Sequence, residues 1–309
     1  MSYQEPVRPV ELARTPPLEL RGRRFDAGSP AVMAIVNRTK DSFWVTAGTG
    51  GLESALAALA VAVESGADIV DVGGVRAGQQ EEPVDAGAEV ARVRPFLLAA
   101  REAYPDVVLS LDTWRSEVLA ACADAGVDLV NDTWAGADPE LVHAAAELGA
   151  GYVVSHTGGL PPRTDPVDVS YGDDPDAVVA SVLSGLAAGA QRAVAAGVRR
   201  RQVLVDPTLD FGKTTRHSLR VLRATAQVAS LGYPVLQAIS RKDFVGETLD
   251  LPADQRLEGS LAATAVAAWL GATVFRTHDV RATRRAVDMV ASIRGERPPA
   301  AARRGERLG

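Results

Sequence analysis

Eight short apolar segments, each followed by a stretch with helical character, are the strongest constraint on how this 309-residue chain can fold. The clearest is Val203-Leu204-Val205, which ends abruptly at Asp206 and the turn-forming Pro207. Short apolar runs bounded by turn signals are typical of strands buried on both faces. The expected strands are residues 31–36, 68–72, 107–111, 128–130, 151–154, 203–205, 234–239 and 272–277.

Helical segments alternate with these strands. They are expected at residues 52–65, 85–103, 116–125, 139–148, 176–196, 217–231 and 257–270, with a last helix ending near residue 293. Eight parallel strand–helix units close into a barrel, and such strands are unbroken Val/Ile/Leu runs. An open doubly wound sheet is the alternative, but its Gly-x-Gly-x-x-Gly fingerprint is absent after the first strand. We therefore predict an α/β fold, an eight-stranded parallel (β/α)8 TIM barrel.

The size and composition are those of one large domain. Hydrophobic residues make up 47% of the chain, enough for a sizeable core, and barrels of this length form single domains. We expect an extended lead-in over residues 1–30, in which 18–25 could form a hairpin. A single barrel should cover 31–294, and a disordered tail 295–309.

The charge balance limits the classes of partner. Lysine and arginine number 33 against 39 acidic residues, a net charge of −6, which gives no support to a nucleic-acid or membrane partner. The single cysteine, Cys122, lies on a helical apolar face and excludes an intrachain disulfide. No apolar leader is recognisable and charges interrupt the Ala-rich stretches, so a cytoplasmic protein is expected.

Polar residues follow the expected strands, and in a barrel all the carboxyl ends meet on one face that carries the chemistry. Asp112, Asn131 and Asp206 offer acceptors and an amide, which suits a flat heterocycle with amino and ring N–H donors. Asp71, within Asp-Val-Gly-Gly, is interpreted as part of an ordinary turn. His156 and Lys242 end two further strands.

A second group of strand-end residues suits an anion. Arg276 and His278 occupy alternate residues at the end of the last strand, so they share one face. A fork-shaped cation beside an imidazole, near helix amino termini, is typical of a phosphate or carboxylate site. The barrel mouth is therefore expected to hold a heterocycle next to an anionic group.

Several motifs in order resemble dihydropteroate synthase. They are Asn37-x-Thr39-x-Asp41-Ser42-Phe43, Asp71-Val72-Gly73-Gly74, Asp112-Thr113, Asn131-Asp132, Asp206-Pro207 with Phe211-Gly212-Lys213, Ser240-Arg241-Lys242, Gly259-Ser260 and Arg276-x-His278-Asp279-Val280. The resemblance covers roughly residues 31 to 290. It implies a folate-pathway transferase that joins a dihydropterin methyl diphosphate to p-aminobenzoate and releases pyrophosphate, with Mg²⁺, usually as a homodimer.

The resemblance also implies a role for each matching residue. The pterin-binding residues would be Asp112, Asn131, Asp206, Phe211 and Lys242. The diphosphate would be held by Asn37, Arg276 and His278, with Asn37 as the Mg²⁺ ligand, and the catalytic residues would be Asp112, Lys242, Arg276 and His278. The second-substrate pocket would involve Lys40, Asp41, Phe43, Val75, Arg76 and Asp243.

The departures from the family pattern fall mostly on the second-substrate side. Lys40 replaces a proline, and the loop Gly73-Gly74-Val75-Arg76-Ala77-Gly78 is two residues shorter than Gly-Gly-Glu-Ser-Thr-Arg-Pro-Gly. Asp243 replaces a serine that helps to hold the p-aminobenzoate carboxylate; we expect it to cap the following segment and to repel that carboxylate.

Two further segments also differ. Thr208 and Asp210 replace two glycines, and Ser155-His156-Thr157-Gly158-Gly159 replaces Met-His-Met-Arg-Gly.

These departures predict a divergent dihydropteroate synthase homologue with weak or no synthase activity. Two alternatives stay open from the sequence. One is a functional synthase with compensating changes, and the other is a pterin-binding or methyl-carrier protein on the same fold.

Overall fold

The computed structural model describes residues 14–37, 51–75, 84–164 and 169–303. Its parallel strands are β3 (Ala31–Asn37), β4 (Ile69–Gly73), β5 (Val108–Asp112), β6 (Leu129–Asp132), β7 (Gly151–Ser155), β8 (Val203–Asp206), β9 (Leu236–Ala238) and β10 (Val274–Thr277). They are ordered β8-β7-β6-β5-β4-β3-β10-β9. The two end strands meet through a bridge between Val205 and Val235. The chain is thus a nearly closed eight-stranded barrel, as predicted.

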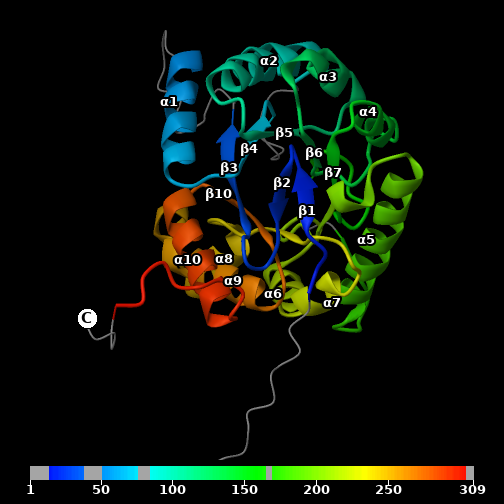
Figure 1. Ribbon diagram of the computed structural model, residues 1–309. Coiled ribbons are helices and arrows are strands. Elements are labelled where there is room, and N and C mark those ends of the chain that lie inside the picture. The colour runs from blue at the N-terminus through cyan, green and yellow to red at the C-terminus, as the bar shows by residue number, and fades with distance from the viewer. Residues whose placement is uncertain (1–13, 38–50, 76–83, 165–168, 304–309) are drawn as a thin grey trace, which may run out of the picture.

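Helices surround the strands in chain order (Figure 1). They are α1 (Gly51–Glu64), α2 (Ala86–Ala103), α3 (Ser116–Ala121), α4 (Leu141–Glu147), α5 (Ala177–Ala195), α6 (Thr215–Arg223), α7 (Thr225–Ala229), α8 (Asp243–Leu249), α9 (Leu257–Trp269) and α10 (Val280–Ile293). In the described residues, α5 alone is long and apolar enough to span a membrane by length and composition. It packs against β7, β8 and α6, and is therefore a helix of the barrel wall.

Two helical expectations need correction. The helix predicted over 217–231 is broken at Ala224, where the Thr225 hydroxyl donates to the carbonyl of Leu222 (2.7 Å) and competes with the helical backbone pattern. The seven-residue α8 was not predicted, because a segment this short, with a glycine at position 246, carries little helical periodicity.

Strand alternation divides the apolar core into two clusters. Side chains on one face of the strands fill the barrel interior, and those on the other face pack under the helices. The interior cluster includes Ala31, Met33, Ile69, Val108, Leu129, Val153, Leu204, Leu236 and Val274. Residues two positions further along each strand must therefore also face the barrel axis, at its carboxyl end.

A β-hairpin closes the amino-terminal end of the barrel. Strands β1 (Leu18–Leu20) and β2 (Arg23–Phe25) pair antiparallel across a two-residue turn, with Arg21 at φ 48° and Gly22 at φ 69°. Positive φ at both positions is the geometry of a tight hairpin turn. Leu18, Leu20 and Phe25 join the interior cluster. The hairpin considered for residues 18–25 is confirmed, whereas the predicted domain limits stay a prediction.

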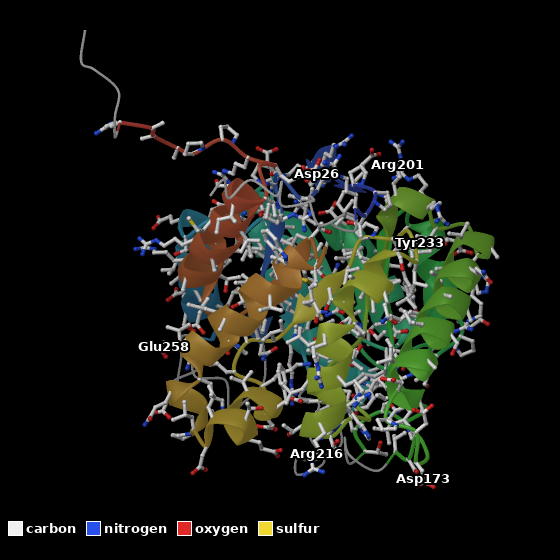
Figure 2. All side chains as sticks on the ribbon, turned by 90° about the horizontal axis from the view of Figure 1, so that it is seen from below. Asp26, Asp173, Arg201, Arg216, Tyr233 and Glu258 are labelled. Atoms are coloured by element: carbon white, nitrogen blue, oxygen red, sulfur yellow. The ribbon has the colours of Figure 1, made fainter. Side chains whose placement is uncertain are left out.

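The two ends of the molecule are easily separated in a view turned by 90° (Figure 2). Asp26 and Arg201 lie at the hairpin end, and Asp173 and Arg216 lie at the opposite end. The carboxyl ends of the strands point toward this second end, which we call the barrel mouth.

Asp68 ties the hairpin to the barrel floor. Its carboxylate accepts hydrogen bonds from Arg23 of β2, from Arg284 of α10 and from the amide of Val32 (3.0 Å). Its side chain is only 16% exposed. Three elements far apart in sequence therefore depend on one carboxylate.

We predict that Asp68→Ala lowers the free energy of unfolding by about 2–4 kcal/mol, because two partly buried arginines lose their shared partner. Urea denaturation of the purified protein measures this. The matched control is Glu19→Ala, which removes the exposed ion pair with Arg201 and should cost about 0.5 kcal/mol or less. Equal losses in the two variants would contradict a special role for Asp68.

Candidate functional site

Polar side chains occupy the layer above the apolar barrel interior. Asp71, Asn131, Asp206 and Arg276 follow Ile69, Leu129, Leu204 and Val274 by two residues each. Because alternate residues of a strand share one face, all four side chains are directed to the barrel axis near the mouth. The sequence therefore places this cluster through strand periodicity alone.

Arg276 joins the members of this cluster. Its Nε donates to Asp71 Oδ2 (2.6 Å) and its Nη2 donates to Asp112 Oδ2 (2.8 Å). The amide of Asn131 also donates to Asp71 Oδ2 (3.0 Å), and the hydroxyl of Ser110 donates to Asp71 Oδ1 (2.6 Å). A guanidinium with two carboxylates has fixed geometry, so this network orients both Asp112 and Asn131.

The interpretation of Asp71 as part of an ordinary turn is wrong. Asp71 lies within β4 and is fully buried, where it is the common acceptor for three side chains. The missed signal was its position: it stands two residues after Ile69 in an otherwise apolar strand, so its charge needs a partner inside the barrel. Arg276 supplies that partner.

Asp112 is the acidic group of the cluster with solvent access, its side chain being 23% exposed. Burial raises its pKa, Arg276 opposes that rise, and the nearby carboxylate of Asp71 adds to it. Oδ2 accepts a hydrogen bond from Arg276, and Oδ1 accepts one from the hydroxyl of Thr133 (3.0 Å). The carboxylate is thus held from two sides at the edge of the cavity.

Asp206 ends β8, and Thr208 fixes its orientation. The Thr208 amide donates to Asp206 Oδ1 (2.7 Å), and the Thr208 hydroxyl donates to the Asp206 carbonyl (3.0 Å). Burial raises the pKa of Asp206, and the charge of Lys242 opposes it. Thr208 has a left-handed backbone, with φ 51°, which is uncommon for a β-branched residue. Thr208 stands where the family pattern has a glycine, and its amide and hydroxyl form two hydrogen bonds with Asp206.

Lys213 fixes the loop that follows β8. Its fully buried ammonium donates to the carbonyls of His156 (2.7 Å), Thr208 (3.1 Å) and Phe211 (2.8 Å). Burial lowers its pKa to about 7. The three carbonyls provide an acceptor for each of the three N–H donors of the buried ammonium. Lys213 therefore stabilises the loop and does not contact a ligand.

Lys242 and Phe211 form another wall of the mouth. The Lys242 ammonium donates to the carbonyl of Leu209 and lies 5.2 Å from the centre of the Phe211 ring. Trp134 packs edge-on against Phe211, with ring centres 5.4 Å apart. Sequence reasoning missed Trp134, because its side chain reaches the site through the ring of Phe211. Phe211, supported by Trp134, gives this wall an aromatic surface.

The anion side lies next to this wall. Phe211, Lys242, Arg276 and His278 line one cavity of about 310 Å³. His278 Nδ1 is 3.2 Å from the Ser240 hydroxyl, and burial lowers the pKa of His278 to about 4. The ring is therefore neutral at pH 7 and can act as a hydrogen-bond partner. The structure brings these predicted residues together.

Asn37, the last residue of β3, is exposed at the same mouth. Gly73 separates it from Asp112: a Cβ built on Gly73 would lie 3.5 Å from Asn37 Oδ1 and 3.5 Å from Asp112 Oδ2. The absence of a side chain at position 73 keeps the space between these two groups open.

Of the predicted second-substrate residues, Lys40, Asp41, Phe43 and Arg76 lie outside the described residues. Val75 is half-buried just after β4.

The expectation that Asp243 caps the helix it begins is wrong. Asp243 is the first residue of α8, and its carboxylate pairs with Arg256 (2.8 Å) with 79% of the side chain exposed. The amides of Asp243 (2.8 Å) and Phe244 (3.4 Å) donate instead to the carboxylate of Asp210. A side chain from a neighbouring loop thus provides the cap.

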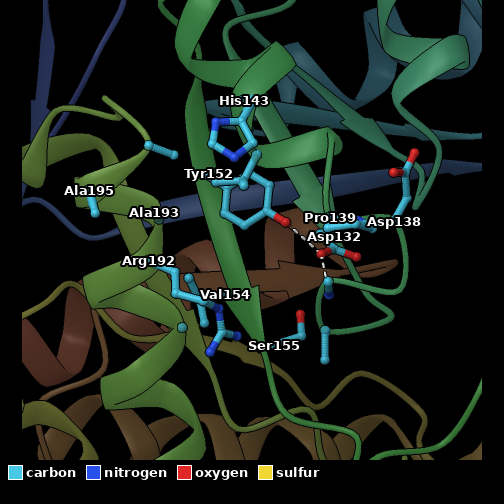
Figure 3. Close-up of a pocket in the computed structure, with 15 residues that line it drawn as sticks. Asp132, Asp138, Pro139, His143, Tyr152, Val154, Ser155, Arg192, Ala193 and Ala195 are labelled. Atoms are coloured by element: carbon cyan, nitrogen blue, oxygen red, sulfur yellow. Dashed lines mark hydrogen bonds between the residues drawn. The ribbon is translucent and has the colours of Figure 1, made fainter.

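A separate hollow lies outside the barrel between α4 and α5 (Figure 3). In it Asp132 accepts hydrogen bonds from the Tyr152 hydroxyl (2.6 Å) and from the amide of Gly136 (2.6 Å). Arg192 and His143 approach from the two helices. None of these residues belongs to the cluster around Arg276, so we assign the chemistry to the mouth.

His156 is not part of the mouth cluster either. It packs beneath α5, with Nε2 3.0 Å from the Ser181 hydroxyl and its ring stacked on Tyr171. Its inclusion among the strand-end residues gathered at the mouth is therefore corrected. Burial lowers the pKa of His156 to about 3, and the charge of Lys213 adds to this effect.

This shift predicts a pH dependence of stability. Because the pKa of the folded state lies below the ordinary imidazole value of about 6.5, the unfolded chain takes up the proton first. The stabilisation is fully present above about pH 6.5 and is lost as the pH falls toward 3. The parent should thus lose about 2 kcal/mol relative to His156→Gln between pH 6.5 and pH 4.5.

Urea midpoints of both proteins across this pH range provide the measurement. His143→Gln, at an exposed position of α4, reports the effect of removing an imidazole from the surface. If the parent and His156→Gln lose stability in parallel, the buried neutral imidazole is not a source of the pH dependence.

Comparison with known proteins agrees with the geometry. A family model described as "Pterin binding enzyme" matches residues 33–278. The chain is 54% identical over 286 residues to "Inactive dihydropteroate synthase 2" of Mycobacterium leprae, covering 93% of this chain and 98% of the relative. A solved Mycobacterium tuberculosis structure is 44% identical with a TM-score of 0.70, covering 91% and 99% of the two chains. The structure of Xanthomonas albilineans dihydropteroate synthase with 4-aminobenzoic acid is 34% identical with a TM-score of 0.80, covering 90% and 98%.

Fold and site together define a (β/α)8 barrel whose mouth combines a carboxylate–amide cluster with a cationic side. The chain belongs to the pterin-binding enzyme family, as a divergent member of the dihydropteroate synthase group.

Proposed function

We propose that this protein binds a pterin at the barrel mouth and has weak or no dihydropteroate synthase activity. The observation that carries the proposal is the arrangement of Asp112, Asn131 and Asp206 around the axis. Asn131 gives its amide N–H to Asp71, which leaves its amide oxygen as an acceptor beside the two carboxylates. Acceptors in this arrangement match the amino and ring N–H donors of a pterin.

Lys242 and Phe211 support this proposal from the side. An ammonium suits the ring oxygen and nitrogen acceptors of the same heterocycle, and an aromatic surface suits its flat face. Asp112 and Arg276 would act as a unit, since Arg276 fixes the carboxylate that receives the ring donors.

The residues for diphosphate release are also present. The neutral His278 and the part of Arg276 that the two carboxylates leave free would stabilise negative charge as pyrophosphate departs. Interactions that strengthen as charge develops lower the barrier of the reaction. Low synthase activity would therefore come from poor binding or orientation of the attacking amine of the second substrate.

Mg²⁺ fits this side of the mouth through Asn37. The described residues contain no group of three His, Cys, Asp or Glu side chains able to hold a metal ion. The protein would thus provide one amide oxygen, and diphosphate and water would provide the other ligands, which is a common mode for Mg²⁺. The bound ion would supply charge neutralisation at the diphosphate.

The second-substrate side supports low synthase activity. Asp243 stands where the resemblance implies a serine that helps to hold the carboxylate of p-aminobenzoate, and Asp210 lines the same cavity beside it. Four proteins that are 52–54% identical to this chain carry the name inactive dihydropteroate synthase 2, whereas relatives near 33% identity are named dihydropteroate synthase. The altered pocket and the names agree.

We further propose a cytoplasmic homodimer. Helices α9 and α10 expose large apolar side chains: Val266, Trp269, Met289 and Ile293. Apolar groups clustered on neighbouring helices are typical of a subunit interface. Sedimentation of the full chain distinguishes the dimer from a monomer.

The experiment is calorimetric titration of the protein with the dihydropterin methyl diphosphate and Mg²⁺. We expect binding by the parent and at least about tenfold weaker binding by Asp206→Asn, because one charge-assisted hydrogen bond contributes about 1.5–3 kcal/mol. Asp173→Asn, at an exposed carboxylate on the same end of the molecule, is the control and should bind like the parent.

Turnover is measured on the same preparation. With p-aminobenzoate present, dihydropteroate formation should be at least about a hundredfold slower than the 1 s⁻¹ common for enzymes, because small displacements of a reacting group cost this much. Turnover near 1 s⁻¹ would instead support a functional synthase with compensating changes. Absence of pterin binding would refute the proposal as a whole.

A further inference from the structure

Asp210 carries a contact that the family resemblance does not explain. Its Oδ2 accepts the amides of Asp243 (2.8 Å) and Phe244 (3.4 Å) at the start of α8. Free amides at the start of a helix are natural donors to an anion. In this protein the donors are already used by a carboxylate of the chain itself.

The position of Asp210 is fixed from a second side. Its amide donates to the Ser218 hydroxyl (3.0 Å), and this hydroxyl donates back to Asp210 Oδ1 (3.2 Å). The backbone is left-handed, with φ 71°, a conformation that Asp tolerates better than most residues but that favours glycine. The carboxylate is thus held between α6 and α8 despite backbone strain.

Asp210 lines the cavity of about 310 Å³, next to Lys242 and Asp243. The Asp243 carboxylate is paired with Arg256 on the exposed side. On this wall an arriving ligand meets two carboxylates, and the backbone donors behind them are occupied.

The cations of the same cavity are engaged elsewhere. Arg241 forms two hydrogen bonds with Asp279 (3.0 and 2.8 Å). Arg276 binds Asp71 and Asp112, and Lys242 donates to a backbone carbonyl. His278 is neutral at pH 7. Among the described residues that line the cavity, Arg241, Lys242 and Arg276 thus each already have a hydrogen-bond acceptor from the chain itself.

We propose that Asp210 determines the class of the second ligand, which presents a neutral or cationic hydrogen-bond donor to this wall instead of a carboxylate. This inference rests on the proposed pterin site, since the second ligand occupies the adjoining part of the cavity. A carboxylate would have to displace Asp210 from the two amides or lie beside its charge. An amide or amidine group finds carboxylate oxygens as acceptors.

The test uses three ligands with one ring and different charges: 4-aminobenzoate, 4-aminobenzamide and 4-aminobenzamidine. Their dissociation constants are measured by calorimetry at neutral pH, on pterin-free and on pterin-saturated protein. On the parent, the amide should bind at least about fivefold more tightly than the benzoate, as expected from like charges at about 4 Å. The amidine should bind at least as tightly as the amide.

The variant Asp210→Asn removes the charge and keeps the shape. It should bring the benzoate-to-amide ratio of dissociation constants close to one. Asp210→Gly suits the left-handed backbone and provides a second, well-folded variant with the same expectation. Asp173→Asn, at an exposed carboxylate on the same end of the molecule but outside this cavity, is the control; the ratio should change by less than about twofold.

The inference is overturned if the parent binds the benzoate as tightly as the amide, if the ratio persists in both Asp210 variants, or if none of the three ligands binds. Pterin affinity is measured separately in the same experiments. If the protein does not bind the pterin, but the pterin-free protein still binds the amide and the amidine more tightly than the benzoate, the proposed function alone is refuted. If the protein binds the pterin but does not prefer the amide and the amidine to the benzoate, the role of Asp210 alone is refuted.

Discussion

The mouth of this barrel depends on one ion pair network, in which Arg276 of β10 binds Asp71 of β4 and Asp112 of β5. Asp71 is fully buried, and a carboxylate without a partner in such a place would cost several kcal/mol. The network also spans the barrel: β3 lies between β10 and β4 in the sheet. Arg276 therefore compensates a buried charge and connects side chains of β4, β5 and β10 at the mouth.

A consequence is that Arg276 has two tasks at once. Two of its nitrogens are engaged with carboxylates, so any anion must share the guanidinium with them. A lysine at this position would supply charge but could not hold both carboxylates in a planar fork. The same residue thus links Asp112, on the heterocycle side of the mouth, to the cavity that Arg276 and His278 line.

Most of the barrel follows from the sequence because its signals are local. Apolar runs ending in a polar residue, such as Val203-Leu204-Val205 before Asp206, give strand positions and direct the last side chains to the mouth. The same rule, applied two residues beyond Ile69, would have found Asp71, and its turn-like Gly-Gly neighbours obscured this.

Other features could not be predicted, because they depend on contacts between distant segments. Asp210 reaches α8 across 33 positions, and Trp134 reaches the site only through Phe211. Comparison of single positions points to Asp243 as the residue that repels a carboxylate, whereas the contacts of Asp210 with α8 are the basis on which we propose Asp210 instead. Predicting such contacts requires knowing how two loops lie relative to each other, and the periodicity of the strands gives no information about this.

The divergence is concentrated on one side of the mouth. Asp112, Asn131 and Asp206 are held by contacts that leave acceptor atoms available, whereas the wall near α8 has its backbone donors closed by Asp210. The loop between them is held by the buried Lys213, whose ammonium donates to three backbone carbonyls. In the function proposed above, the half that would bind the pterin is retained and the half that would bind the second ligand is altered.

A crystal structure of the protein with a bound reduced pterin tests this account most directly. The account predicts the ring between Asp112, Asn131 and Asp206, with Arg276 still bound to Asp71 and the carboxylate of Asp210 still on the amides of α8. A pterin bound outside the mouth, or an Asp210 side chain displaced from α8 in the complex, would contradict it.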